Sequence, residues 1–160
     1  MSDKTRQQDA AMPRPASPGR RSGFRTLVGY HAEVWRDGYA ELVLDIGPQH
    51  LNSGGIVHGG VLATLLDAAC GHAAAWVSVP GNVRRTVTIS LNTNFLAPAR
   101  SGRLRAIGRL LGIDARRIAT LTAEVLDEAG DVIAICQASF RYERGSEQSA
   151  GTRPEKLREQ

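Results

Sequence analysis

The sequence predicts an α+β domain in which a single antiparallel sheet is wrapped around one long central helix. Two observations support this prediction. The segment 58–79 is apolar nearly all round and ends at Pro80 and Gly81, as expected for a buried helix. Several other segments alternate apolar and polar side chains with the period of two that is typical of strands. With 160 residues, the chain is expected to form one domain.

The strands are expected on both sides of this helix along the chain. Asp37 and Gly38 form a hairpin turn signal between the first two strands, and Val87, Ile89 and Leu91 alternate with polar residues after the helix. A sheet with a single helix leaves strand edges exposed, so we expect the chain to oligomerise. The expected strands cover residues 31–36, 39–46, 86–96, 103–113, 117–126 and 132–142.

Both ends of the chain differ in composition from its centre. Residues 1–22 are rich in Pro, Arg, Ser and Gln and are predicted to be disordered, and residues 145–160 are polar and are expected to be loose. The folded unit is therefore expected at residues 23–144. The net charge of the chain is +4, and the first 22 residues contribute +3 through five basic and two acidic side chains. Because the positive charge lies mainly in this tail, we expect no nucleic-acid partner.

Cysteine usage and hydropathy favour a cytoplasmic protein. Cys70 and Cys136 fall inside expected elements without the spacing of metal ligands, so we expect reduced, buried thiols and no metal. The helix has the length of a membrane span, but Asp67 and His72 interrupt it and no segment resembles a signal peptide, so we expect no membrane partner. His72 is expected to be a core or interface residue, and His50 a surface residue.

Asp67 is a charge in the middle of the apolar helix. No Lys or Arg occurs within a turn or two of it, and an unpaired buried carboxylate is costly. One interpretation is structural, with a buried Asp67 that accepts hydrogen bonds from backbone N–H groups. The neighbours of Asp67 on the helical wheel favour a reactive group instead, because all of them are small and leave space beside the carboxylate. These neighbours are Gly60, Ala63, Thr64, Gly71 and Ala74.

His58, Gly59 and Gly60 open the same helix. Backbone N–H groups at a helix N-terminus are unpaired, and glycine lets a carbonyl oxygen or a forming oxyanion approach them, although a loop that needs glycine only for its turn is an alternative. Gly59 and Asp67 are separated by eight residues, which places them about 12 Å apart along one helix and roughly 80° around it. One small reacting centre cannot readily contact both, so we expect active sites that are shared between two copies of the chain.

These residues resemble the hotdog-fold acyl-CoA thioesterases of the phenylacetate-degradation type. The matching runs are NSGGIVHGGVLATLLDAACG at residues 52–71 and TISLNTNFLAPA at residues 88–99, followed by Gly102. The resemblance spans about residues 28–142 and implies the hotdog fold.

The resemblance also implies roles for five residues. Asp67 corresponds to the catalytic carboxylate, which either activates water or attacks the thioester carbon, and the Gly59 N–H to the oxyanion donor. Asn52 falls where the family often has an amide that holds the thioester carbonyl. His58 lies at a position associated with the carbonyl and the thiolate leaving group, and Thr88 where some members have a hydroxyl that orients water.

The implied activity is hydrolysis of an acyl- or aryl-CoA to the free acid and coenzyme A. No separate cofactor is expected, because coenzyme A is part of the substrate, and the expected assembly is a homodimer that pairs into a homotetramer. Arginines at strand ends are candidates for binding the phosphates of coenzyme A. For each one, the alternative is a solvated charge at the sheet edge without a role in binding. These candidates are Arg84, Arg85, Arg100, Arg103 and Arg117.

Two other functions stay open. One is a non-catalytic acyl-CoA-binding hotdog module, and the other is a hotdog hydratase or dehydratase that acts on acyl thioesters. The latter enzymes typically use a different pattern of histidine and acidic residues, and a purely binding protein would keep Asp67 in an apolar helix without a catalytic return. The sequence leaves the acyl group open.

Overall fold

The computed structural model describes residues 22–157, so the prediction of a disordered tail falls almost entirely outside the described residues. Within this range the strands and the central helix follow the predicted order. The elements are α1 (Gly23–Val28), β1 (His31–Arg36), β2 (Tyr39–Asp45), the 3-10 turn η1 (Pro48–His50), α2 (Gly59–Ala75), β3 (Thr86–Phe95), β4 (Arg103–Ile113), β5 (Ile118–Leu126), β6 (Val132–Tyr142) and the 3-10 turn η2 (Pro154–Leu157).

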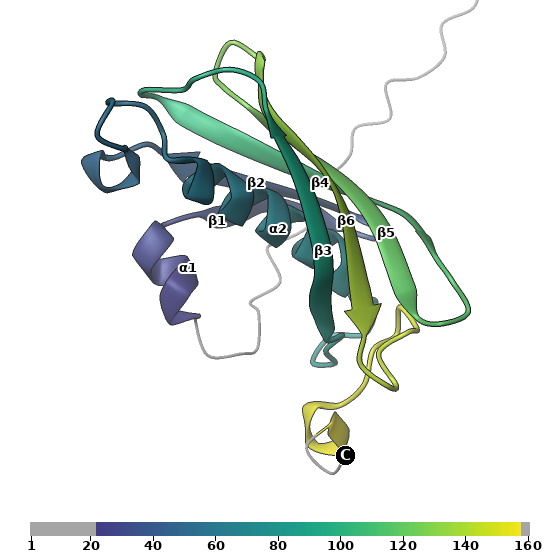
Figure 1. Cartoon of the computed structure of the whole chain (residues 1–160). Coiled ribbons are helices and arrows are strands. Elements are labelled where there is room, and N and C mark those ends of the chain that lie inside the picture. Colours follow the sequence, from purple (N-terminus) through teal and green to yellow (C-terminus); the bar gives the residue numbers. More distant parts are fainter. Residues whose placement is uncertain (1–21, 158–160) are drawn as a thin grey trace, which may run out of the picture.

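The strands form one antiparallel sheet in the order β1-β2-β4-β5-β6-β3. The sheet curves around α2, which lies along its concave side (Figure 1). The predicted α+β class is therefore confirmed, and all strand boundaries agree with the predicted ones to within one residue. Strands β1 and β3 are the two edges of the sheet, which leaves them available for pairing.

Helix α2 is shorter than predicted and is buried on one face only. It ends at Ala75 because Trp76 adopts an extended backbone (ψ 141°), and the Trp76 carbonyl accepts a hydrogen bond from Arg84 Nη1 at 3.0 Å. The opposite face, which the sequence suggested would also be buried, stays partly exposed around Asp67. The side chains that face the sheet are Leu62, Leu65, Leu66, Ala69, Cys70, Ala73 and Ala74.

The helix touches the sheet most closely at Gly108 of β4. A Cβ atom at this position would lie 2.3 Å from the carbonyl oxygen of Ala69 and 2.9 Å from the backbone nitrogen of Cys70. Only glycine therefore allows the backbone of α2 to rest on this strand, and small residues on the helix side of the contact keep the two elements close.

The segment after β6 packs against the body of the domain, unlike the loose segment that its polar composition predicts. The side chain of Ser146 is fully buried, and Val83 and Thr152 exchange backbone hydrogen bonds at 2.9 Å. The reason is Arg84, which lies under this segment and donates to the Ser146 and Glu147 carbonyls. The buried guanidinium thus binds backbone carbonyls of the segment, and the composition of the segment does not predict this interaction.

We predict that Gly108→Ala lowers the free energy of unfolding by about 3 kcal/mol, because the added methyl overlaps the helix backbone. Urea denaturation monitored by circular dichroism measures this loss. The matched control is Gly112→Ala on the same strand, where a Cβ meets no atom within 4 Å and the change should stay below about 1 kcal/mol. Equal stability of the two variants would contradict the close contact.

Candidate functional site

Asp67 is held by a hydroxyl group from the edge strand. Thr88 Oγ1 donates a hydrogen bond to Asp67 Oδ1 at 2.8 Å. A shift in the β3–β6 register between Thr88 and Ser90 marks a bulge at this point, and such bulges re-aim side chains. Thr88 is exposed and Asp67 partly exposed, so the carboxylate remains hydrated more than the sequence suggested. This residual hydration and the Thr88 hydroxyl explain how a charge without a neighbouring cation is tolerated.

No ion pair within residues 22–157 includes Asp67, in agreement with the absence of a nearby cation in the sequence. The face beside the carboxylate is open, as predicted. Gly60 is exposed, and Ala63, Thr64 and Gly71 are partly exposed, whereas the more distant Ala74 is buried. A reacting molecule can therefore approach Asp67 along the helix in both directions.

The start of α2 presents a backbone N–H group. His58 caps the helix through its imidazole, since Nδ1 accepts from the Gly60 N–H at 2.8 Å, and the His58 carbonyl accepts from Val61 at 2.9 Å. The Gly59 N–H finds no acceptor among residues 22–157. Because an unpaired N–H at a helix N-terminus favours negative charge, Gly59 is a suitable oxyanion donor.

Asn52 shapes the loop that leads into the helix. Its Oδ1 accepts hydrogen bonds from the Gly54 N–H at 2.9 Å and the Ile56 N–H at 3.4 Å. The carbonyl end of the side chain is therefore occupied by the loop, and its Nδ2 group is the end that remains for a ligand.

The five predicted catalytic residues form two groups in one chain. Asn52, His58 and Gly59 lie at the N-terminal end of α2, and Asp67 and Thr88 lie at its middle. Because Gly59 and Asp67 both belong to the unbroken helix, the rise per residue separates them by about 12 Å. The separation from which the sequence analysis inferred a shared site is therefore present in this chain.

The candidate arginines are also divided between the two ends of the domain. Arg100 Nη1 donates to the Gly54 and Gly55 carbonyls near the start of α2, and Arg103 makes two hydrogen bonds with Asp45. Arg84, Arg85 and Arg117 lie at the other end, where Arg85 pairs with Glu143 and Arg117 with Glu147. One chain therefore does not gather them into a single cluster.

Arg84 differs from the other four because it is buried and has structural partners. Its Nε, Nη1 and Nη2 atoms donate to the carbonyls of Ser146, Trp76 and Glu147 at 3.1, 3.0 and 3.0 Å, and its guanidinium lies 4.5 Å from the centre of the Tyr142 ring. These contacts give Arg84 a structural role that needs no ligand. The sequence did not predict its burial, because that burial depends on the segment after β6.

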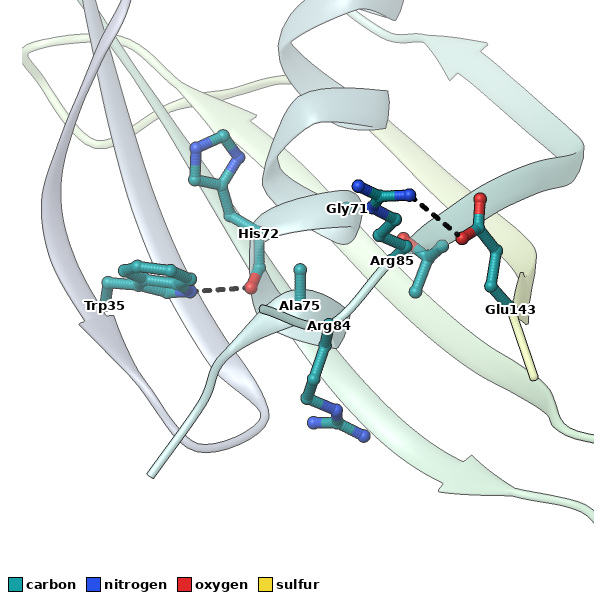
Figure 2. A pocket seen from close by; sticks show the side chains of 8 residues that line it. Trp35, Gly71, His72, Ala75, Arg84, Arg85 and Glu143 are labelled. Atoms are coloured by element: carbon teal, nitrogen blue, oxygen red, sulfur yellow. Dashed lines mark hydrogen bonds and ion pairs between the residues drawn. The ribbon is translucent and has the colours of Figure 1, made fainter. Parts of the chain in front are cut away.

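Sequence reasoning missed a cavity of about 470 Å³ at the C-terminal end of α2. We call it the C-terminal groove (Figure 2). Its Trp35 donates through Nε1 to the His72 carbonyl at 2.7 Å, which ties β1 to the helix. Of the small residues on the helical wheel of Asp67, only Gly71 lines the groove, and the sequence does not place Trp35 beside it. The groove is lined among others by Trp35, Gly71, Ala75, Arg85, Thr86 and Glu143.

The two histidines compare differently with their predictions, because His72 is partly buried in line with a core or interface position whereas His50 does not lie at the surface. His72 Nδ1 donates to the Ala68 carbonyl at 2.7 Å, and burial lowers its pKa, with Arg25 acting in the same direction and the Ala68 bond opposing it. His50 was expected at the surface but is buried, because its Nδ1 accepts from the Gly47 N–H and its Nε2 donates to the Val28 carbonyl. Local composition does not show such backbone partners.

Both cysteines are buried and free, as predicted. Cys70 and Cys136 lie with their sulfur atoms 3.8 Å apart, and the hydrogen bond between them raises the pKa of Cys70 and lowers that of Cys136. Within the described part of the chain, no three His, Cys, Asp or Glu side chains converge to hold a metal ion. None of the helices in residues 22–157 combines the length and hydropathy that a bilayer span requires.

Comparison with known proteins assigns this architecture to one superfamily. Residues 54–134 match the model of the Thioesterase superfamily, which covers half of the chain. The chain belongs to this superfamily, and its single sheet around one helix is the hotdog fold.

Individual relatives agree with this assignment. The chain is 31% identical over 131 residues to a Halobacterium salinarum protein named as a putative esterase, and the match covers 76% of this chain and 85% of the relative. A Thermoplasma volcanium protein with the same description is 32% identical over 88 residues, and the match covers 55% of this chain and 64% of that protein. The chain thus spans slightly less than two thirds of this second relative.

Solved structures share the fold. A conserved protein from Pseudomonas aeruginosa, PA5202, is 29% identical with a TM-score of 0.72, and the match covers 81% of this chain and all of that one. The PaaI protein from the phenylacetic acid degradation operon of E. coli has a TM-score of 0.68 at 19% identity, over 77% of this chain and 86% of its own length. The latter likeness supports the fold alone.

We predict that Arg84→Met lowers the free energy of unfolding by about 3 kcal/mol or more, because three backbone carbonyls lose a charged donor. Chemical denaturation measures the loss, and limited proteolysis should show cleavage within residues 146–152. In the control Arg85→Met, an exposed ion pair of 3.7 Å is lost and the change should stay below about 1 kcal/mol. An Arg84→Met protein as stable as this control would refute the structural role.

Proposed function

We propose that the protein is an acyl-CoA thioesterase of the phenylacetate-degradation type, which hydrolyses an acyl- or aryl-CoA to the free acid and coenzyme A. The main observation behind this proposal is the Asp67 carboxylate, which is held by Thr88 on an open helix face. Membership in the Thioesterase superfamily supports the reaction class. The acyl-CoA substrate and the residue roles are the proposal.

The proposed reaction needs a base or nucleophile and a donor for the developing oxyanion. Asp67 either removes a proton from an attacking water or attacks the thioester carbon itself, and both routes form a tetrahedral centre with a negative oxygen. The Gly59 N–H donates to this oxygen at the positive end of α2. The C–S bond then breaks, and the thiolate of coenzyme A leaves without needing a strong general acid.

The other residues of the two groups assist this reaction. The Thr88 hydroxyl holds one carboxylate oxygen and leaves the second for water or the substrate carbon. The His58 ring is exposed and uses Nδ1 for the cap, so its Nε2 can contact the substrate carbonyl or the thiolate. The Asn52 Nδ2 group can donate to the same carbonyl, since the loop occupies only Oδ1.

We propose that each active site combines Asp67 of one chain with Gly59 of another. Edge strand β3 supports this arrangement, because it carries Thr88 and exposes Val87 and Ile89 by about half of their surface. A second copy that covers this edge would bring its own helix start towards Asp67. We further propose that such dimers pair into tetramers, and that the exposed arginines of both chains contribute to the phosphates of coenzyme A.

We predict that Asp67→Asn lowers kcat for acyl-CoA hydrolysis by roughly a hundredfold or more, because the amide can neither accept a proton nor attack. The amide oxygen still accepts from Thr88, so the fold should be retained. Thiol release is measured with aromatic, short, medium and long acyl-CoAs. Asp131→Asn, which alters an exposed loop residue, serves as the control. Wild-type activity no higher than that of Asp67→Asn on all substrates would favour an acyl-CoA-binding module.

The shared site is tested with mixed dimers. Gly59→Pro removes the N–H group and adds a ring whose Cβ would lie 3.4 Å from Phe95 Cζ, and proline is well tolerated at the first position of a helix, especially after the extended His58 (ψ 134°). Asp67→Ala and Gly59→Pro chains should each be inactive alone. Mixed one to one after co-expression, they should recover about a quarter of wild-type activity, because half of the dimers then contain one complete site. No recovery in verified mixed dimers would contradict the shared site.

A further inference from the structure

The lining of the C-terminal groove begins one helical turn away from the candidate catalytic carboxylate. Gly71 lies one helical turn after Asp67 on the same side of α2, and Ala75 lies one turn further. On β3, Thr86 precedes Thr88 by two residues, and both lie opposite buried residues of β6, so they share the inner face of the sheet. The helix and the strand therefore lead from the Asp67–Thr88 hydrogen bond into the groove.

The walls of the groove differ in chemistry. Figure 2 shows Trp35 on one side and Arg85 with Glu143 on the other, with Gly71 and Ala75 of the helix between them. The Trp35 N–H is already bonded to the His72 carbonyl, so the indole offers the groove an apolar surface. The floor of small residues and this indole suit a hydrocarbon group.

We propose that the C-terminal groove holds the acyl arm of the thioester, and that Gly71 and Ala75 determine how long this arm can be. The inference rests on the proposed acyl-CoA hydrolysis. With Asp67 at the thioester carbon, Gly71 is about 6 Å and Ala75 about 12 Å along the groove. An extended chain covers these distances with roughly five and ten carbons, which defines medium-length acyl groups as the substrate class.

The charges of the groove disfavour the opposite orientation, with the coenzyme A arm inside. The three nitrogen atoms of Arg84 donate to backbone carbonyls, and Arg85 faces Glu143 at 3.7 Å. Burial lowers the pKa of His72 and so disfavours its charged form. Phosphate groups would meet the Glu143 carboxylate there, whereas Arg100, beside Gly54 and Gly55 before α2, is exposed and has no acidic partner among residues 22–157.

Packing does not require glycine at position 71. A Cβ there would meet Phe140 Cε1 at 3.5 Å, which is an ordinary contact, and the backbone is helical. The missing side chain therefore has its main effect on the space in the groove. This contrasts with Gly108, where the backbone of α2 excludes any side chain.

The test introduces methionine at two positions along the groove. Gly71→Met and Ala75→Met place the same flexible group, a good helix former, one turn apart, and Ala129→Met in the exposed loop after β5 is the control. The value of kcat/KM is measured for straight-chain acyl-CoAs from acetyl to dodecanoyl. Gly71→Met should keep acetyl-CoA turnover and lose about tenfold or more from hexanoyl-CoA upwards, and Ala75→Met should show a similar loss only from about decanoyl-CoA upwards.

The two proposals fail in different ways. A wild-type protein that hydrolyses none of these substrates contradicts the proposed function itself. A wild-type protein that is active, with both variants showing equal losses at every chain length or no loss at all, overturns the acyl-arm assignment alone. Binding of the same acyl-CoAs to folded Asp67→Asn chains carrying each Met substitution, measured by calorimetry, must show the same dependence on length.

Discussion

The direct contact between the α2 backbone and β4 is the constraint on which the structure depends. It exists because Gly108 has no side chain and Ala69 presents its carbonyl at the same point. With the helix seated on the sheet, the leucines of α2 and its inward alanines Ala69, Ala73 and Ala74 are buried, and the sheet curves around them. The same contact fixes the distance of the outward face of α2 from edge strand β3, where Thr88 reaches Asp67.

The group that orients the Asp67 carboxylate is not a charged partner. A neutral hydroxyl orients Asp67, so the charge is not consumed by a salt bridge and remains free to react. At the helix start, His58 satisfies the Gly60 N–H and leaves that of Gly59 open. In the proposed reaction, capping and oxyanion binding therefore fall to neighbouring residues, and neither group of residues alone is a complete centre for acyl transfer.

Sequence patterns predicted the strands, the helix start and the catalytic candidates because these features depend on local periodicity and on short motifs. Family resemblance singled out Thr88 as a hydroxyl that orients water, whereas its hydrogen bond to Asp67 and the bulge beside it were not visible in the sequence. The end of α2, the burial of Arg84 and the position of Trp35 depend on contacts across 8 to 63 residues, such as those of Arg84 with Trp76 and Glu147. Period and composition carry no information about such contacts.

At Gly71, the stability of the helix and the space in the groove place opposite demands on the residue. A glycine inside a helix is less stable than alanine by roughly 0.5–1 kcal/mol, and at this position alanine would fit. Selection for a stable fold alone would therefore replace it, as it could not replace Gly108. At Gly71 the helix gives up stability that its own packing does not require, and under the proposed acyl-arm assignment this loss keeps space for an occupant of the groove.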